Sequence, residues 1–167
     1  QKRVSVLATE IARRMNFPED RIEGIRVAGL IHDIGKIAVP VEILSKPGKL
    51  SVMEFELIKT HSRVGYDLLK DIEFAWPLAD IVHQHHERMD GSGYPRGLAG
   101  DAILPEARII SVADVVEAIT YHRPYREGLG VGVAIEALRE GSGKHFDPQV
   151  VDTCIELLEG GLDLLVI

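Results

Sequence analysis

The sequence predicts an all-α domain, and three observations support this prediction. Apolar residues recur at helical spacing along most of the chain, and no segment alternates apolar and polar residues over the length of a strand. Start and stop signals for helices flank the apolar stretches. The 167 residues, 46% hydrophobic and 27% charged, suit one domain with its own core. We therefore expect a compact bundle of helices in a single domain over residues 1–167.

The beginning of the chain predicts two helices. From Val4 to Met15, apolar residues follow the i, i+3, i+4, i+7 pattern of one helix face. Pro18 suits the first turn of a second helix, over about Glu19–Ile31. That helix is apolar nearly all round near its end, so we expect it to be central. Gly35 is expected to loosen the chain just after it.

The rest of the chain predicts five more helices. Ser51 and Glu54 form a capping box that opens a long helix. Pro77 stands near the start of another, which is expected to carry three histidines. A glycine-rich loop over Asp90–Asp101 follows. The remaining helices are expected at Glu106–Thr120, Val131–Arg139 and Pro148–Glu159, the last capped by Asp147.

Charge and cysteine content exclude several classes of protein. There are 19 basic and 26 acidic residues, a net charge of −7, which opposes binding to DNA or RNA polymers. A small anion held by metals and a few local cations remains compatible with this charge. One cysteine, Cys154, cannot form a disulfide framework and suits a reducing cytoplasm. No apolar run approaches the ~20 residues of a membrane span, so we expect a cytoplasmic protein.

Several polar residues stand in strongly apolar surroundings. His32 and Asp33 follow five apolar residues, and Asp114 lies inside an apolar helix pattern. A buried carboxylate or imidazole is costly unless it is paired or bound to a metal. We therefore expect a positive charge near Asp114.

Seven histidines add to this pattern, and three of them form a cluster in His83–Glu87. A single histidine is most often an ordinary surface or core residue, but here separate helices are expected to direct His or Asp inward, and another supplies His61. Imidazole together with carboxylate suits Fe, Mn, Zn, Ni or Co. More than four candidate ligands predict two metals rather than one.

Three motifs in order resemble the HD-GYP domain, a bacterial subgroup of the HD phosphohydrolase superfamily. They are HDIGKI at 32–37, HHERMDGSGYP at 85–95 and RPYR at 123–126, with Asp114 between the last two. The resemblance covers essentially the whole chain. It implies an HD-domain helix bundle around a binuclear or trinuclear metal centre. It also implies hydrolysis of cyclic di-GMP to pGpG, and onward to GMP, in bacterial second-messenger signalling.

The same resemblance implies roles for individual residues. Asp33 would bridge the metals, two or three divalent ions, with Fe or Mn favoured over Ni, Co or Zn. Asp33 and Lys36 would be catalytic. The implied metal ligands are His32, Asp33, His61, His85, His86 and Asp114. The implied substrate-binding residues are Lys36, Gly93, Tyr94, Arg123 and Arg126.

Plainer interpretations of the substrate-binding positions stay open. Lys36 would also suit the C-terminal end of a helix as a solvated cation. Arg123 and Arg126 would serve equally as exposed loop arginines, and Gly93 as a turn residue. Tyr94 would either stack on a base or pack on Pro95.

The resemblance also implies residues and domains that precede Gln1, and a partner protein. The family's first ligand histidine precedes an x-x-Arg-Val sequence, which Gln1–Val4 matches, so that histidine is expected one residue before Gln1. In members with a third metal, a glutamate is expected a turn earlier. We expect the C-terminal output domain of a longer protein, truncated at its N-terminus, after a sensory or receiver domain. The GYP loop is also expected to contact a diguanylate-cyclase-type or adaptor protein.

Two alternative functions belong to other classes. A catalytically inactive HD-GYP module would bind a cyclic dinucleotide or a partner protein. The only feature that favours it is that the family's first ligand histidine, expected just before Gln1, is not in this sequence. A di-iron oxygenase would use similar ligands, but the GYP and RPYR motifs disfavour that alternative.

Overall fold

The computed structural model describes residues 1–121 and 128–162. This part of the chain is helical, with two isolated β-bridges and no sheet, so the predicted all-α class is confirmed. The α-helices are α1 (Lys2–Arg14), α2 (Glu19–Ile31), α3 (Val41–Leu44), α4 (Val52–Leu69), α5 (Leu78–Gln84), α6 (Pro105–Thr120), α7 (Val131–Gly141) and α8 (Pro148–Glu159). Two short 3₁₀ helices are η1 (Ile34–Ala38) and η2 (Gly100–Ala102). Among the described residues, no helix is long and apolar enough to cross a membrane.

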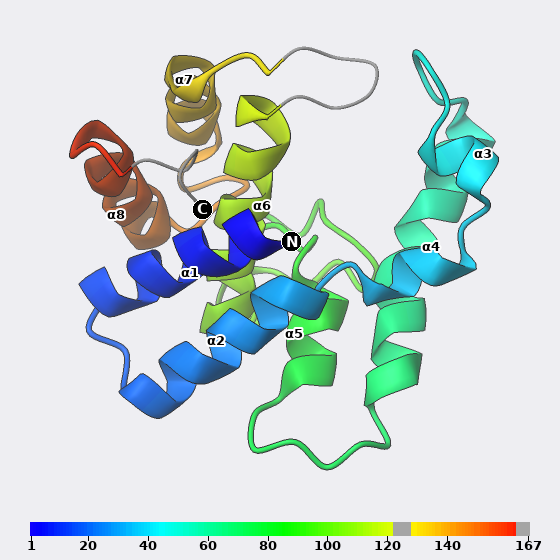
Figure 1. Cartoon of the computed structure of the whole chain (residues 1–167), viewed down its shortest axis with the longest axis horizontal. Coiled ribbons are helices and arrows are strands. Elements are labelled where there is room, and N and C mark those ends of the chain that lie inside the picture. The colour runs from blue at the N-terminus through cyan, green and yellow to red at the C-terminus, as the bar shows by residue number, and fades with distance from the viewer. Residues whose placement is uncertain (122–127, 163–167) are drawn as a thin grey trace.

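Helix α6 occupies the centre of the bundle (Figure 1). It packs against α1, α2, α5, α7 and α8, and Ile109, Ile110 and Val112 are fully buried on it. The expectation that the second helix would be central is wrong. Helix α2 buries Ile22, Ile25 and Ala28, whereas three apolar residues near its end remain partly exposed, namely Val27, Leu30 and Ile31. Its apolar end lies beside the candidate site rather than in the middle of the core.

Glycines permit two close contacts that set the positions of the site elements. A Cβ on Gly29 would lie 2.6 Å from the Cα of Ser5, so α2 lies directly on α1. A Cβ on Gly35 would lie 1.9 Å from the carbonyl oxygen of His61, so η1 lies directly on α4. Real Cβ atoms do not tolerate either distance. The contact at Gly35 places the His32-Asp33 pair beside His61.

The predicted start of α4 is confirmed, but α5 is shorter than predicted. The capping box is confirmed: the Glu54 N–H donates to Ser51 Oγ at 3.3 Å, and the Ser51 N–H donates to Glu54 Oε2 at 2.7 Å. Helix α5, however, ends at Gln84 and contains only one of the three histidines. Successive helical residues point about 100° apart, so ending the helix here allows His85 and His86 to face the same site.

The loop that follows is held in place by backbone and side-chain contacts. An isolated antiparallel β-bridge joins Asp90 to Ala99 and brings the two ends of the loop together. Gly93 lies so close to the backbone of residues 86–88 that a Cβ would come within 2.4 Å of the Arg88 nitrogen. The structure also confirms the predicted cap of α8, where the Gln149 N–H donates to Asp147 at 2.9 Å. Cys154 is buried in the core, as expected.

Candidate metal centre

Four side chains converge beside η1, at the inner face of α4. One ligand atom from each of Asp33, His61, His85 and His86 lies within 4.8 Å of the others. His61 Nε2 is 3.3 Å from His85 Nε2 and 3.4 Å from Asp33 Oδ1. These residues come from the end of α2, the middle of α4 and the end of α5.

Asp33 connects this group to the two remaining predicted ligands. Its Oδ2 atom lies 3.6 Å from His32 Nε2, which is in turn 3.5 Å from Asp114 Oδ1. The structure therefore brings together all six residues that the motif resemblance implied as ligands. His32, whose pKa is raised, lies beside Asp114, in agreement with the positive charge expected near that carboxylate.

The backbone orients three of the imidazoles. The Nδ1 atoms of His32, His61 and His85 lie 2.9, 2.6 and 2.6 Å from the carbonyl oxygens three residues earlier in the chain. An Nδ1–H donating to a carbonyl leaves the lone pair on Nε2, which is the tautomer that a metal ligand requires. Each ring therefore presents Nε2 to the cluster.

Burial and charge divide the titratable groups into two kinds. Burial lowers the pKa values of His61 and His86, and it lowers the pKa of His85 to about 3. Burial also lowers the pKa of His32, but the carboxylates of Asp114 and Asp33 outweigh it and raise that pKa. Three neutral imidazoles and one imidazole beside two carboxylates make a donor set suited to divalent transition metals.

Two buried atoms support the same interpretation. His32 Nε2 and Asp33 Oδ1 are among the buried side-chain atoms of the described residues that have no hydrogen-bond partner. Buried polar atoms are normally satisfied, and both of these point into the cluster. For both carboxylates, burial raises the pKa but the neighbouring His32 reverses the direction, so Asp33 and Asp114 have lowered pKa values. The residues present therefore fit a metal ion.

Lys36 reaches the cluster from η1. Its Nζ donates to Asp33 Oδ2 at 2.6 Å, so it does not project into solvent as a free helix-end cation. Gln1 also contacts this carboxylate, with Nε2 at 3.1 Å from Oδ2. Sequence reasoning gave Gln1 no role, because an exposed glutamine carries no motif signal.

The GYP loop borders the cluster through Tyr94. Its ring lies 4.8 Å from the His86 ring, centroid to centroid, at an interplanar angle of 30°. Gly93 packs on the backbone behind His86. Arg123 and Arg126, the other predicted substrate-binding residues, lie outside the described residues, as does His122.

Two other histidines lie away from the cluster. His83 stacks on Tyr66 at 4.6 Å between ring centroids. His145 is 43% exposed, and its Nε2 is 3.8 Å from Asp90 Oδ2. Neither contributes a ligand atom to the cluster.

Sequence reasoning assigned no role to Glu87, which holds the loop. Its buried carboxylate accepts hydrogen bonds from the backbone N–H groups of Arg96 at 2.7 Å and Leu98 at 2.9 Å. Gln84 similarly accepts from the Leu104 N–H at 2.8 Å. The sequence did contain a signal for this role, because Glu87 directly follows the His85-His86 pair and precedes a glycine-rich loop.

These features agree with the result of comparison with known families. The sequence model of the HD domain family matches residues 1–150, and the chain belongs to this family. The predicted membership in the HD superfamily is thereby confirmed.

The chain is also similar in sequence to individual curated proteins. The chain is 43% identical over 156 residues to the cyclic di-GMP phosphodiesterase response regulator RpfG of Xanthomonas campestris, covering 92% of this chain and 41% of the relative. It is 45% identical over 148 residues to a cyclic di-GMP phosphodiesterase of Pseudomonas aeruginosa, covering 88% and 36%. It is 38% identical over 155 residues to a 3'3'-cGAMP-specific phosphodiesterase of Vibrio cholerae, covering 92% and 36%. The chain thus spans about two fifths of the length of these relatives.

Solved structures share the fold. An HDG"Y"P protein from Bdellovibrio bacteriovorus superimposes with a TM-score of 0.79 at 22% identity, over 95% of this chain and 51% of that chain. The HD domain of the Listeria monocytogenes phosphodiesterase PgpH gives a TM-score of 0.61 at 20% identity, over 95% and 89%. The predicted HD-domain bundle is confirmed.

Proposed function

We propose that this domain is a metal-dependent phosphodiesterase that hydrolyses cyclic di-GMP to pGpG, and onward to GMP. The observation that carries the proposal is the convergence of four histidines and two aspartates, with imidazole Nε2 atoms directed at a shared carboxylate. The names of the relatives from Xanthomonas and Pseudomonas support cyclic di-GMP as the substrate.

We assign two metals to the cluster, with Fe or Mn favoured. His32, Asp33 and Asp114 would hold one, and Asp33, His61, His85 and His86 the other, because His32 lies at one oxygen of Asp33 and beside Asp114, whereas His61 lies at the other oxygen, among the second group. When bound, the metals would neutralise phosphate oxygens and lower the pKa of bound water toward neutrality. Ni, Co or Zn would suit the same donors, and a third ion would need further ligands.

The chain's own groups would position the substrate. Lys36 holds Asp33 Oδ2 and presents an ammonium group to an incoming phosphate. Tyr94 borders the cluster and offers a ring face to a base. Glu87 keeps Tyr94 in place by anchoring the loop. Arg123 and Arg126 would offer planar forks to phosphate or guanine.

The direct test is turnover by the metal-loaded chain. Protein reconstituted with Mn²⁺ or, without oxygen, with Fe²⁺ is incubated with cyclic di-GMP, and the products are separated by chromatography. We expect pGpG to form and then GMP, and EDTA to stop the reaction. Tight binding of cyclic di-GMP without product, at full metal occupancy, would instead favour the inactive binding module.

We also propose a setting for the domain. Its span of about two fifths of its relatives supports an output domain that follows a sensory or receiver domain in a longer protein. The exposed GYP loop would be the contact for a diguanylate-cyclase-type or adaptor protein. Hydrolysis of an intracellular messenger would place the domain in the cytoplasm.

A further inference from the structure

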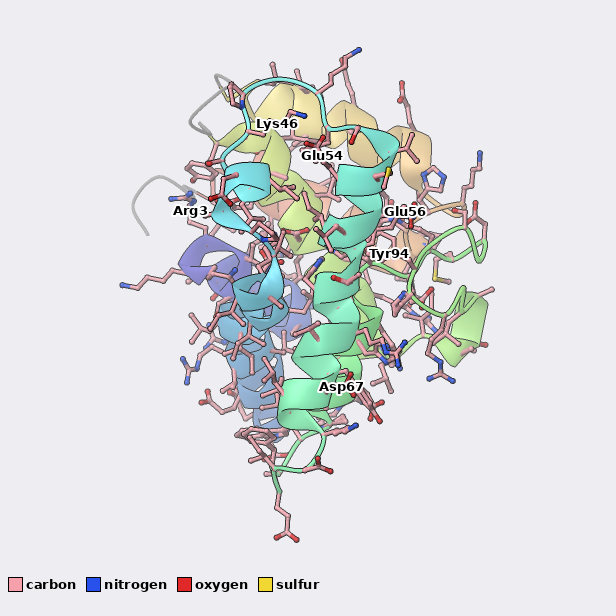
Figure 2. All side chains as sticks on the ribbon, turned by 90° about the vertical axis from the view of Figure 1, so that its right-hand side faces the viewer. Arg3, Lys46, Glu54, Glu56, Asp67 and Tyr94 are labelled. Atoms are coloured by element: carbon pink, nitrogen blue, oxygen red, sulfur yellow. The ribbon has the colours of Figure 1, made fainter. Side chains whose placement is uncertain are left out.

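A pocket of about 310 Å³ lies between α4 and the loop that carries Tyr94, which contacts the candidate metal centre. It is lined by Tyr94 and Pro95 of the loop and by the α4 residues Glu56, Lys59, Thr60 and Arg63. Their spacing of i, i+3, i+4 and i+7 places the four on one face of the helix. Figure 2 shows Glu56 on α4 and Tyr94 from the loop at the same side of this helix.

The pocket lies beside the cluster, and Tyr94 contacts both. Tyr94 contacts His86 with its ring and also lines the pocket. Thr60, which also lines the pocket, directly precedes the cluster residue His61 in α4. A ligand with a phosphate at the cluster therefore has the pocket beside it for the group attached to that phosphate.

The lining combines acidic and basic side chains with the Tyr94 ring, and this combination suits a planar base. The Arg63 side chain is 78% exposed, and its Nε lies 3.9 Å from Asp67 Oδ2, a loose pair that leaves its fork available. Glu56 is 60% exposed, with Oε1 2.6 Å from Lys59 Nζ. The lining thus carries one carboxylate, which pairs with Lys59, and the further cation Arg63. A base that carries both N–H donors and oxygen or nitrogen acceptors can donate to the Glu56 carboxylate and accept from the Arg63 guanidinium group.

We infer that this pocket receives a guanine base of the cyclic dinucleotide, an inference that rests on the proposed function. Tyr94 stacks on the base, Arg63 donates to its O6 and N7 atoms, and Glu56 accepts from a base N–H. Arginine forks discriminate guanine in this way because adenine carries an amino donor where guanine has O6. Arg63 is thus the residue that sets base preference.

The test compares substrates that differ in their bases. The metal-loaded wild type, Arg63→Ala and Arg139→Ala are assayed on cyclic di-GMP, cyclic di-AMP and the base-free ester bis(4-nitrophenyl) phosphate. Arg139, an exposed arginine of α7 that pairs with Glu159, is the matched control. We expect Arg63→Ala to lower the kcat/KM for cyclic di-GMP, relative to the ester, by about 10- to 100-fold. The preference for cyclic di-GMP over cyclic di-AMP should shrink, and Arg139→Ala should resemble the wild type.

Other outcomes overturn the inference. An equal loss on both dinucleotides would show a phosphate contact, and an equal loss on all three substrates would show a general defect. No loss at all would leave Arg63 without this role. If the wild type cleaves the ester but no dinucleotide, the proposed function fails, and calorimetric titration with GMP and AMP judges the pocket separately. If the wild type binds GMP more tightly than AMP, and Arg63→Ala does not, the result supports the pocket. Equal binding of GMP and AMP by the wild type would refute it.

Discussion

At the scale of single residues, the two oxygens of Asp33 have different neighbours. Oδ1 faces His61, whereas Oδ2 faces His32 and accepts from Lys36. One carboxylate therefore joins two groups of imidazoles that come from different helices. Lys36 compensates part of its charge, so the carboxylate stays ionised within a largely buried site.

Replacing this carboxylate tests its central place. We expect Asp33→Ala to lose metal binding and phosphodiesterase activity together, because both of the proposed metal positions would share this ligand. Metal content by mass spectrometry and cyclic di-GMP turnover are the measurements, with circular dichroism to confirm folding. A folded variant that keeps two metals per chain and a near-normal rate would contradict the assignment.

At the scale of elements, close backbone contact decides where the ligands lie. Gly35 lets η1 rest on α4, and the turn after Gln84 brings His85 and His86 to the same side. Glu87 then fixes the following loop against the cluster. Three short irregular segments thus do more to shape the site than the long helices.

Adding a methyl group at the η1–α4 contact should separate the elements. The Cβ of Gly35→Ala would lie 1.9 Å from the His61 carbonyl oxygen, so the backbone must shift. We expect a loss of about 1–3 kcal/mol in the free energy of unfolding and weaker metal binding, measured by urea denaturation and metal titration. The control is Gly132→Ala on α7, where a Cβ meets nothing within 4 Å. Equal behaviour of the two variants would argue against the contact.

The capping box of α4 predicts a pH dependence of stability. The hydrogen bond from Lys46, followed by those from Ser51, lowers the pKa of Glu54 from 4.5 to about 2. A lowered folded-state pKa gives stability that is present above 4.5 and lost as the pH falls toward 2. We therefore expect wild type to be more stable than Glu54→Gln near neutrality, with the difference shrinking between pH 4.5 and 2. A pH-independent difference in urea midpoint would contradict this.

At the scale of the whole molecule, the cluster residues come from two groups of packed elements. Helices α1, α2 and α6 pack on one another, and η1 and α5 pack on α4 (Figure 1). The six cluster residues belong to both groups, so a bound metal would hold them together. Ligand binding to the folded state alone raises stability through mass action.

Metal binding should therefore stabilise the whole domain. We expect Mn²⁺ at about 100 times its Kd to add about 2.7 kcal/mol to the free energy of unfolding, measured as a rise in Tm. His85→Ala should lose most of this rise, whereas His83→Ala should keep it, because His83 stacks on Tyr66 outside the cluster. An equal rise in both variants would place the metal elsewhere.

Local patterns in the sequence were sufficient for the helical class and for most helix boundaries. Periodicity, proline and capping residues act within a few positions of the chain, so α1, α2, α4 and α8 were predicted closely. The motifs also identified all six cluster residues. Arg123 and Arg126 remain predictions, since they lie outside the described residues.

Only the tertiary structure decided how these residues meet. The sharing of Asp33 between two groups of histidines depends on η1 lying against α4, a contact between residues 26 positions apart that spacing cannot encode. The central place of α6, the early end of α5 and the anchoring of the loop by Glu87 likewise arise from packing. Sequence patterns determined which groups are present, because those depend on residue type and local spacing. Three-dimensional packing determined which atoms face one another, because that depends on volume and contact across the fold.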